Sequence, residues 1–233
     1  CAACHVCEGG GDLARNHCPN RTVLGILGKH GTYAEFLTLP CRNLHVVPDN
    51  VTDAAALFAE PLAAACRILE QGLAPPEARA AVLGDGKLGL LIAEVLARRA
   101  ASTVFSDERS RPGSTTIIGR HREKMVLCCA GLGDAEGRGE LTRVDAGDES
   151  AVTAMAGAFD VVVDATGSPL GLASACALCR PMGTVVLKST CAAGAGFNPA
   201  PIVINEQRVV GSRCGPFEAA LELLASSSDD VID

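Results

Sequence analysis

A glycine-rich stretch near the middle of the chain has the residue types and spacing of a phosphate-binding loop. Gly84, Gly86 and Gly89 form a GxGxxG pattern between the apolar segment AAVL and an amphipathic segment that begins at Lys87. In this pattern the first glycine allows a tight turn, the second lets backbone approach a pyrophosphate, and the third lets helix and strand pack closely. The strand–helix setting favours a dinucleotide site over a plain glycine turn, and we predict coenzyme contacts from the three glycines, Lys87 and Leu88.

The end of the next strand decides which dinucleotide fits, because an acid there binds a ribose 2′-hydroxyl and a base accepts a 2′-phosphate. Two segments compete for that strand. STVF would place Asp107 at its tip and predict NAD, whereas TTII ends at Gly119, followed by Arg120 and His121. We favour TTII because residues 106–114 have loop composition, and we predict NADP in preference to NAD. Arg120 would hold the 2′-phosphate with Gly119 and His121 beside it; the alternative for Arg120 is a solvated surface side chain.

Four cysteines at the start of the chain have the spacing of a structural metal site. They follow the pattern C-x2-C-x2-C-x10-C and are Cys1, Cys4, Cys7 and Cys18. Four thiolates complete the tetrahedral shell of zinc and leave no position open for chemistry, so we predict a structural zinc. A redox-active CxxC pair and unconnected cysteines are the alternatives. His5 and His17 could replace a ligand, although we expect neither to bind.

Composition and charge narrow the class of protein and its partners. The 233 residues are 48% apolar and 3% aromatic, which favours packed α/β layers over an aromatic-rich sandwich. The formal charge is −7 and no block of basic residues stands out, so we expect no nucleic-acid partner. No apolar run approaches the roughly 18 residues of a membrane span, and we expect a soluble protein. Several of the 12 cysteines lie in apolar stretches, which suits a reducing compartment.

Between residues 80 and 214, short apolar segments alternate with helical patterns. The predicted strands are AAVLG, TTIIG, ELTRVD, FDVVVDAT, GTVVLKST and QRVVGSRC. Strand–helix repeats with right-handed crossovers yield one parallel sheet. Before the sheet, residues 53–72 have helical composition, and residues 1–50 have loop composition with short extended pieces at 33–39 and 44–47.

Together these motifs resemble the medium-chain, zinc-dependent alcohol dehydrogenase superfamily, particularly its polyol and threonine dehydrogenase-like members. The resemblance covers nearly the whole chain and rests on the cysteine lobe, GTYAEFLTLP, AEPLAAA, GDGKLG and DATGSP. It implies an α/β fold in which residues 73–214 form a Rossmann domain, a doubly wound parallel sheet. Residues 1–72 would be the remainder of a GroES-like, β-rich catalytic domain with the zinc lobe and linking helices. Residues 215–233 would form a helix that returns toward that domain.

The resemblance also implies roles for individual residues. In members with an EPL motif, the glutamate binds or lies beside the catalytic zinc, and Glu60 has that position; the alternative is a first-turn glutamate that stabilises its helix. The family's nicotinamide end is lined by the turn after the fourth strand and the end of the fifth. The corresponding residues here are Ala165, Thr166, Gly167, Lys188 and Ser189. For the last two, a surface role is the alternative.

Two departures from the family pattern affect these expectations. The fourth cysteine follows the third after ten residues instead of seven, which a longer loop can accommodate at small entropic cost. The family's catalytic-zinc Cys and His and its proton relay lie upstream of the cysteine lobe. Because this chain begins at Cys1, we interpret it as a fragment whose catalytic residues are unknown.

We therefore expect a zinc-dependent oxidoreductase that transfers hydride between NADP(H) and an alcohol or polyol, or its carbonyl, with little turnover by the fragment alone. The alternatives are a zinc-free quinone or enone reductase of the same superfamily and a non-catalytic dinucleotide-binding module. The expected partners are a small alcohol or carbonyl substrate and further copies of the chain in a dimer or tetramer, without nucleic acid or membrane. We expect a cytoplasmic protein, with an organelle left open because the amino-terminal region is missing.

Overall fold

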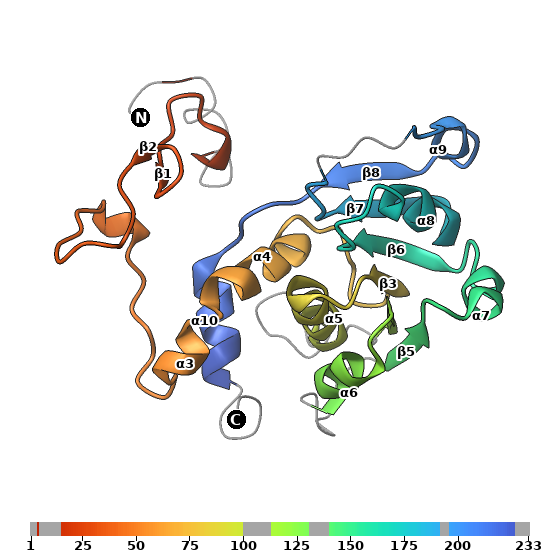
Figure 1. Ribbon diagram of the computed structural model, residues 1–233, viewed down its shortest axis with the longest axis horizontal. Helices are drawn as coiled ribbons and strands as arrows, with labels where there is room; N and C mark the ends of the chain where they lie inside the picture. Colours follow the sequence, from red (N-terminus) through yellow and green to blue (C-terminus); the bar gives the residue numbers. More distant parts are fainter. Residues whose placement is uncertain (1–3, 5–14, 100–112, 131–139, 192–195, 227–233) are drawn as a thin grey trace. The chain divides into compact units, whose positions relative to one another are not determined.

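The chain forms two compact units, and the computed structural model describes residues 4, 15–99, 113–130, 140–191 and 196–226. The first unit ends at Val46 and the second begins at Val47. All strands and helices of the predicted dinucleotide domain lie in the second unit (Figure 1). Across the described ranges, no helix is long and apolar enough to cross a membrane. The domain boundaries expected at residues 72 and 214 stay predictions.

The first unit has little regular structure among its described residues. It contains the short parallel strands β1 (Val23–Leu24) and β2 (Gly28–Lys29), and the 3-10 turns η1 (Arg15–His17) and η2 (Cys41–Asn43). The extended pieces expected at 33–39 and 44–47 do not form strands. Extended backbone becomes a strand only where a second segment pairs with it, and no described segment does so here.

A six-stranded, fully parallel sheet forms the centre of the second unit, which confirms the predicted α/β fold. Its spatial order is β5 (Leu141–Asp145), β4 (Thr115–Gly119), β3 (Ala80–Leu83), β6 (Phe159–Asp164), β7 (Cys179–Leu187) and β8 (Arg208–Gly211). Counted along the chain from β3, this is the order 3-2-1-4-5-6 of a doubly wound dinucleotide-binding sheet. TTIIG is thus the strand that pairs with β3, as predicted, while STVF lies outside the described residues.

Helices cover both faces of this sheet (Figure 1). One face carries α4 (Ala59–Glu70), α5 (Lys87–Arg98) and α6 (Arg122–Ala130), with α10 (Phe217–Ser226) packed on α4 and the short α3 (Asp53–Ala56). The other face carries α7 (Glu149–Ala154), α8 (Gly171–Leu178) and α9 (Ala200–Ile204). Two helical layers explain why the central strands read as continuous apolar runs instead of alternating patterns.

Strand β3 shows how the two layers share the sheet. Ala80 and Val82 pack in the cluster beneath α4 and α5, whereas Ala81 and Leu83 pack in the cluster beneath α8. Successive side chains of a strand point to opposite faces, so a strand between two helical layers needs apolar residues at every position. The small alanines let the helices approach the strand that begins the dinucleotide motif.

A buried arginine ties together the loops at the amino-terminal edge of the sheet. Arg99, 2% exposed, follows α5 and donates hydrogen bonds to the carbonyl oxygens of Pro75 (3.0 Å), Leu96 and Ala78 and to the Thr115 hydroxyl (2.9 Å). Burial lowers the pKa of Arg99 to about 10, which still leaves the guanidinium charged at neutral pH. This side chain therefore satisfies several carbonyl groups at once.

Replacing Arg99 by Met should destabilise the fold by on the order of 3 kcal/mol, because it removes the guanidinium donor from the buried Ala78 carbonyl and the buried Thr115 hydroxyl. Urea unfolding followed by circular dichroism measures this change. Arg143→Met, which removes an exposed charge from β5, is the control and should stay within about 0.5 kcal/mol of wild type. Equal unfolding free energies of the two variants would show that Arg99 does not stabilise the amino-terminal edge of the sheet.

Candidate functional site

The glycine loop between β3 and α5 has the backbone geometry that the sequence pattern predicts. Gly84 has a φ of +102°, and a side chain there would place its Cβ 2.7 Å from the carbonyl oxygen of Ala165. A Cβ at Gly89 would overlap the carbonyl oxygen of Gly84. These two positions exclude side chains because the turn, the helix and the segment after β6 approach one another closely.

Gly86 differs from the other two glycines because space is open around it. It is the exposed amino-terminal cap of α5, with a φ of −71°, and a Cβ there would meet no described atom within 4 Å. The first turn of a helix carries backbone N–H groups without intrahelical acceptors, and the helix dipole favours anions at this end. The open space beside these N–H groups therefore leaves room for a pyrophosphate, and Lys87 begins the helix next to it.

At the tip of β4, an acid from the glycine loop takes the space that a strand-end side chain would need. A Cβ at Gly119 would lie 2.5 Å from the Cβ of Asp85. The Asp85 carboxylate accepts hydrogen bonds from the His121 backbone N–H (2.5 Å) and lies 3.1 Å from His121 Nδ1. Arg120 and His121 are exposed at this tip. Our sequence reasoning missed Asp85, although an acid inside the glycine motif was a visible signal.

The turn after β6 is fastened to the end of β7 by one buried carboxylate. Asp164, 2% exposed, accepts hydrogen bonds at Oδ1 from the Thr166 backbone N–H (3.0 Å), the Thr166 hydroxyl (2.7 Å) and the Ser189 hydroxyl (3.1 Å). Ser189 Oγ also accepts a hydrogen bond from the Gly167 N–H at 2.9 Å. The structure thus brings together Thr166, Gly167 and Ser189, which the resemblance predicted, and adds Asp164, which it did not.

Lys188 connects the end of β7 to α4 and to the residue that follows β8. Its Nζ donates to the carbonyl oxygen of Ala64 (2.5 Å) and to the hydroxyl of Ser212 (3.2 Å). Burial lowers the pKa of Lys188 to about 8, while the negative charge of nearby Glu60 opposes that change. Lys188 is therefore a partly buried link between elements at the carboxyl edge of the sheet.

The predicted metal ligands lie partly within the described residues. Glu60 is exposed in the first turn of α4, and the described ranges hold no cluster of three or more His, Cys, Asp or Glu residues suited to a metal. In the first unit, the Sγ atoms of Cys4 and Cys18 lie 3.7 Å apart and are not joined by a disulfide. Two thiolates on one tetrahedral zinc are about 3.8 Å apart, so this pair fits the ion. Cys1 and Cys7 lie outside the described residues.

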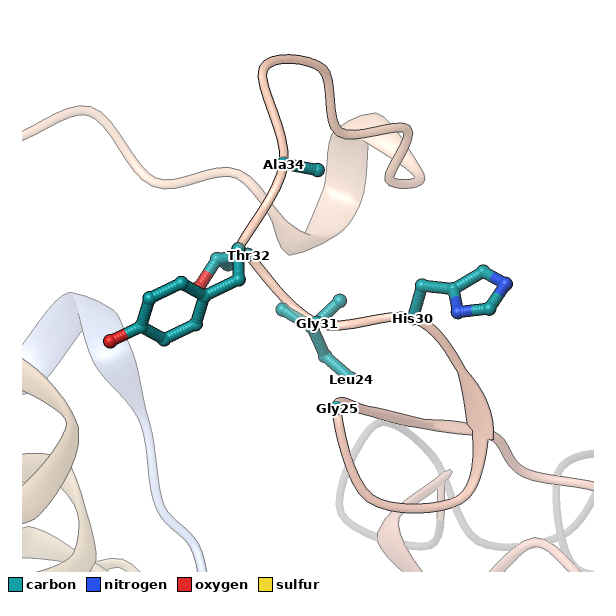
Figure 2. Close-up of a pocket in the computed structure, with 7 residues that line it drawn as sticks. Leu24, Gly25, His30, Gly31, Thr32 and Ala34 are labelled. Carbon is teal, nitrogen blue, oxygen red and sulfur yellow. The ribbon is translucent and has the colours of Figure 1, made fainter.

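A separate hollow of about 710 Å³ lies in the first unit, between the loop at Gly25 and residues 30–34 (Figure 2). Leu24, His30, Thr32 and Tyr33 are among the residues that line it. None of its described lining residues is Asp, Glu, Lys or Arg, and none of the predicted coenzyme contacts lies there. The predicted coenzyme site is therefore at the glycine loop and not in this hollow.

Comparisons with known proteins agree with the dinucleotide-binding fold. The family model described as "Zinc-binding dehydrogenase" matches residues 139–226. Glucose 1-dehydrogenase 2 of Vulcanisaeta moutnovskia is 32% identical over 94% of the chain, and the (R,R)-butanediol dehydrogenase of Bacillus subtilis is 27% identical over 81%. Among solved structures, a protein assigned as a zinc-binding dehydrogenase from Sinorhizobium meliloti 1021, bound to NADP, is 26% identical and superposes over 99% of the chain with a TM-score of 0.76.

With the sheet order and glycine loop, these matches show that the chain belongs to the medium-chain, zinc-dependent alcohol dehydrogenase superfamily. An alcohol dehydrogenase from Thermus sp. ATN1, 25% identical with a TM-score of 0.72, has the same fold. The chain spans 62% of the length of the V. moutnovskia enzyme, 50% of that of the B. subtilis enzyme and 64% of the S. meliloti chain.

The lowered pKa of Lys188 predicts a pH-dependent contribution to stability. Between about pH 8 and the ordinary lysine pKa of 10.5, the unfolded chain binds more protons at this residue than the folded chain does, so stability gained from Lys188 rises with pH. The difference in unfolding free energy between wild type and Lys188→Met should therefore shift in favour of wild type across this window. Lys124→Met, at an exposed lysine of α6, should show no such shift. Parallel pH profiles for wild type and Lys188→Met would contradict the assignment.

Proposed function

We propose that the chain is the dinucleotide-binding part, with a zinc lobe, of an oxidoreductase that transfers hydride between a nicotinamide coenzyme and an alcohol or polyol, or its carbonyl. The observation that carries the proposal is the open space at Gly86, at the amino end of α5, on a sheet with the dinucleotide-binding strand order. The names of the related proteins, which include glucose, butanediol and alcohol dehydrogenases, support the substrate class.

NADP is the proposed coenzyme in preference to NAD. Strand β4 ends at Gly119, and the next two residues, Arg120 and His121, carry groups that can bind a 2′-phosphate. The related S. meliloti structure holds NADP, which supports this choice.

In this proposal the residues of the chain bind and orient the reactants. The amides at the start of α5 hold the pyrophosphate, and Arg120 holds the 2′-phosphate. The turn fixed by Asp164, with Thr166, Gly167 and Ser189, would line the nicotinamide end. When bound, the coenzyme supplies the hydride acceptor or donor, and a catalytic zinc beside Glu60 would polarise the substrate oxygen. Lys188 keeps the helix that carries Glu60 attached to the sheet edge.

A substitution at Gly86 tests the coenzyme site without disturbing the fold. Gly86→Asp places a favourable cap on α5 but sets a negative charge where the pyrophosphate would lie. We expect the unfolding free energy to stay unchanged or rise by up to about 1 kcal/mol. Affinity for NADP⁺ by titration calorimetry should fall at least about 100-fold.

Thr52→Asp is the matched control, because it places an acid at the cap of a different helix, α3, and should leave coenzyme affinity unchanged. If the wild-type chain binds neither NADP⁺ nor NAD⁺ at millimolar concentration, the proposed function is wrong. Wild-type affinity in Gly86→Asp would show that the coenzyme lies elsewhere.

We also propose that the cysteine lobe holds one structural zinc, supported by the sulfur separation of Cys4 and Cys18. Purified protein should contain one zinc per chain by mass spectrometry. Cys18→Ser should lose the metal on dialysis against a weak chelator, whereas Cys41→Ser, at an exposed free thiol of the same unit, should keep it. Retention of zinc by Cys18→Ser would remove Cys18 from the ligand set.

A further inference from the structure

The tip of β4 holds a carboxylate, but one that comes from another part of the chain. In a dinucleotide-binding sheet an acid at the end of this strand accepts a hydrogen bond from the ribose 2′-hydroxyl. Here Gly119 ends the strand, and Asp85 of the glycine loop occupies the space beside it, 2.5 Å from where a Cβ at 119 would lie. The side chain of Asp85 is only 11% exposed.

Asp85 uses its carboxylate to hold His121. The backbone N–H of His121 donates to Oδ2 at 2.5 Å, and ring atom Nδ1 lies 3.2 Å and 3.1 Å from the two carboxylate oxygens. Burial works to raise the pKa of Asp85, but the hydrogen bonds from the backbone and ring of His121 outweigh it and keep that pKa below its ordinary value. Asp85 is therefore ionised at neutral pH.

The ionised carboxylate determines the hydrogen position on the ring. Because a carboxylate has no proton to give, Nδ1 of His121 must carry the hydrogen and donate it. The second ring nitrogen, Nε2, lies on the far side of the imidazole from Asp85, and the side chain is 51% exposed. Asp85 thus fixes the direction of the ring and leaves Nε2 as the nitrogen that can meet a ligand.

We propose that Asp85 is a positioning residue for coenzyme selectivity: through His121, it aims the outer ring nitrogen at the 2′ substituent of the bound coenzyme. The inference rests on the proposed coenzyme site and adds to it the contact that distinguishes NADP from NAD. Arg120 supplies a charge at the same tip, whereas His121 supplies a directed hydrogen bond.

The same ring can meet either coenzyme, but with different bonds. As a neutral ring, His121 offers a lone pair at Nε2 that accepts a hydrogen bond from a ribose hydroxyl. As a cation, it donates from Nε2 to a 2′-phosphate while Nδ1 still donates to the Asp85 carboxylate. A hydrogen bond between a charged donor and a charged acceptor is stronger than one to a neutral hydroxyl, so the contact favours NADP over NAD.

The experiment compares two fragments of the coenzyme that differ only at the 2′ position. Titration calorimetry with 2′,5′-ADP and with 5′-ADP gives an affinity ratio that reports the 2′ contact alone and needs no turnover. His121→Ala should weaken 2′,5′-ADP binding about tenfold, as expected for one hydrogen bond to a charged group, and change 5′-ADP binding by less than about twofold. Asp85→Asn should lower the ratio as well, although Asp85 itself need not touch the ligand.

Two further variants distinguish a positioning role of Asp85 from a direct contact of Asp85 with the ligand and from a change in local charge. In the His121→Ala background, Asp85→Asn should cause no additional change in the ratio, because its effect passes through the ring. Lys124→Ala removes an exposed positive charge from the same segment and should change the ratio by less than about twofold.

The inference would be overturned if His121→Ala leaves the ratio of 2′,5′-ADP to 5′-ADP affinity unchanged. It would also be overturned if Asp85→Asn still changes that ratio in the His121→Ala background. Either result would leave the coenzyme site intact. Failure of the wild-type chain to bind either fragment would overturn the coenzyme site itself and the inference with it.

Discussion

The close approach of three backbone segments at the carboxyl end of β3 is the constraint on which the candidate site depends. Gly84 turns against the carbonyl of Ala165, and Gly89 lets the first turn of α5 lie against Gly84. A side chain at Gly84 would collide with the segment after β6, and one at Gly89 would push the helix away from the turn. The start of α5, whose first amides have no acceptor within the helix, is therefore held at the carboxyl ends of the neighbouring strands β3 and β6, and the space around Gly86 stays open.

Much of this arrangement could be predicted from local sequence, because its causes are local. The apolar runs AAVL and TTII fit strands buried on both faces, and the glycine spacing fits a turn followed by a helix. The polar composition of residues 106–114 favoured TTII over STVF as the second strand, and the pairing of β4 with β3 confirms it. Patterns of this kind depend on neighbours in the chain, so they can be recognised without knowledge of the fold.

The contacts that sequence reasoning missed join residues far apart in the chain. Asp85 meets His121 across 36 residues, and Lys188 meets Ala64 across 124. A single polar residue has no periodicity, so nothing in the sequence shows which partner it will find. The segments at 33–39 and 44–47, which were expected to be extended, do not form strands for a related reason. A strand needs a second segment to pair with, and composition does not show whether such a segment is present.

The buried carboxylate of Asp164 has a consequence for the energetics of association. Its bonds to Thr166 and Ser189 already immobilise the turn after β6 without any ligand. If the proposed coenzyme binds beside this turn, ordering the turn costs little further entropy, and more of the interaction free energy is left to distinguish one ligand from another. The arrangement of this turn is therefore set when the chain folds and does not depend on a ligand.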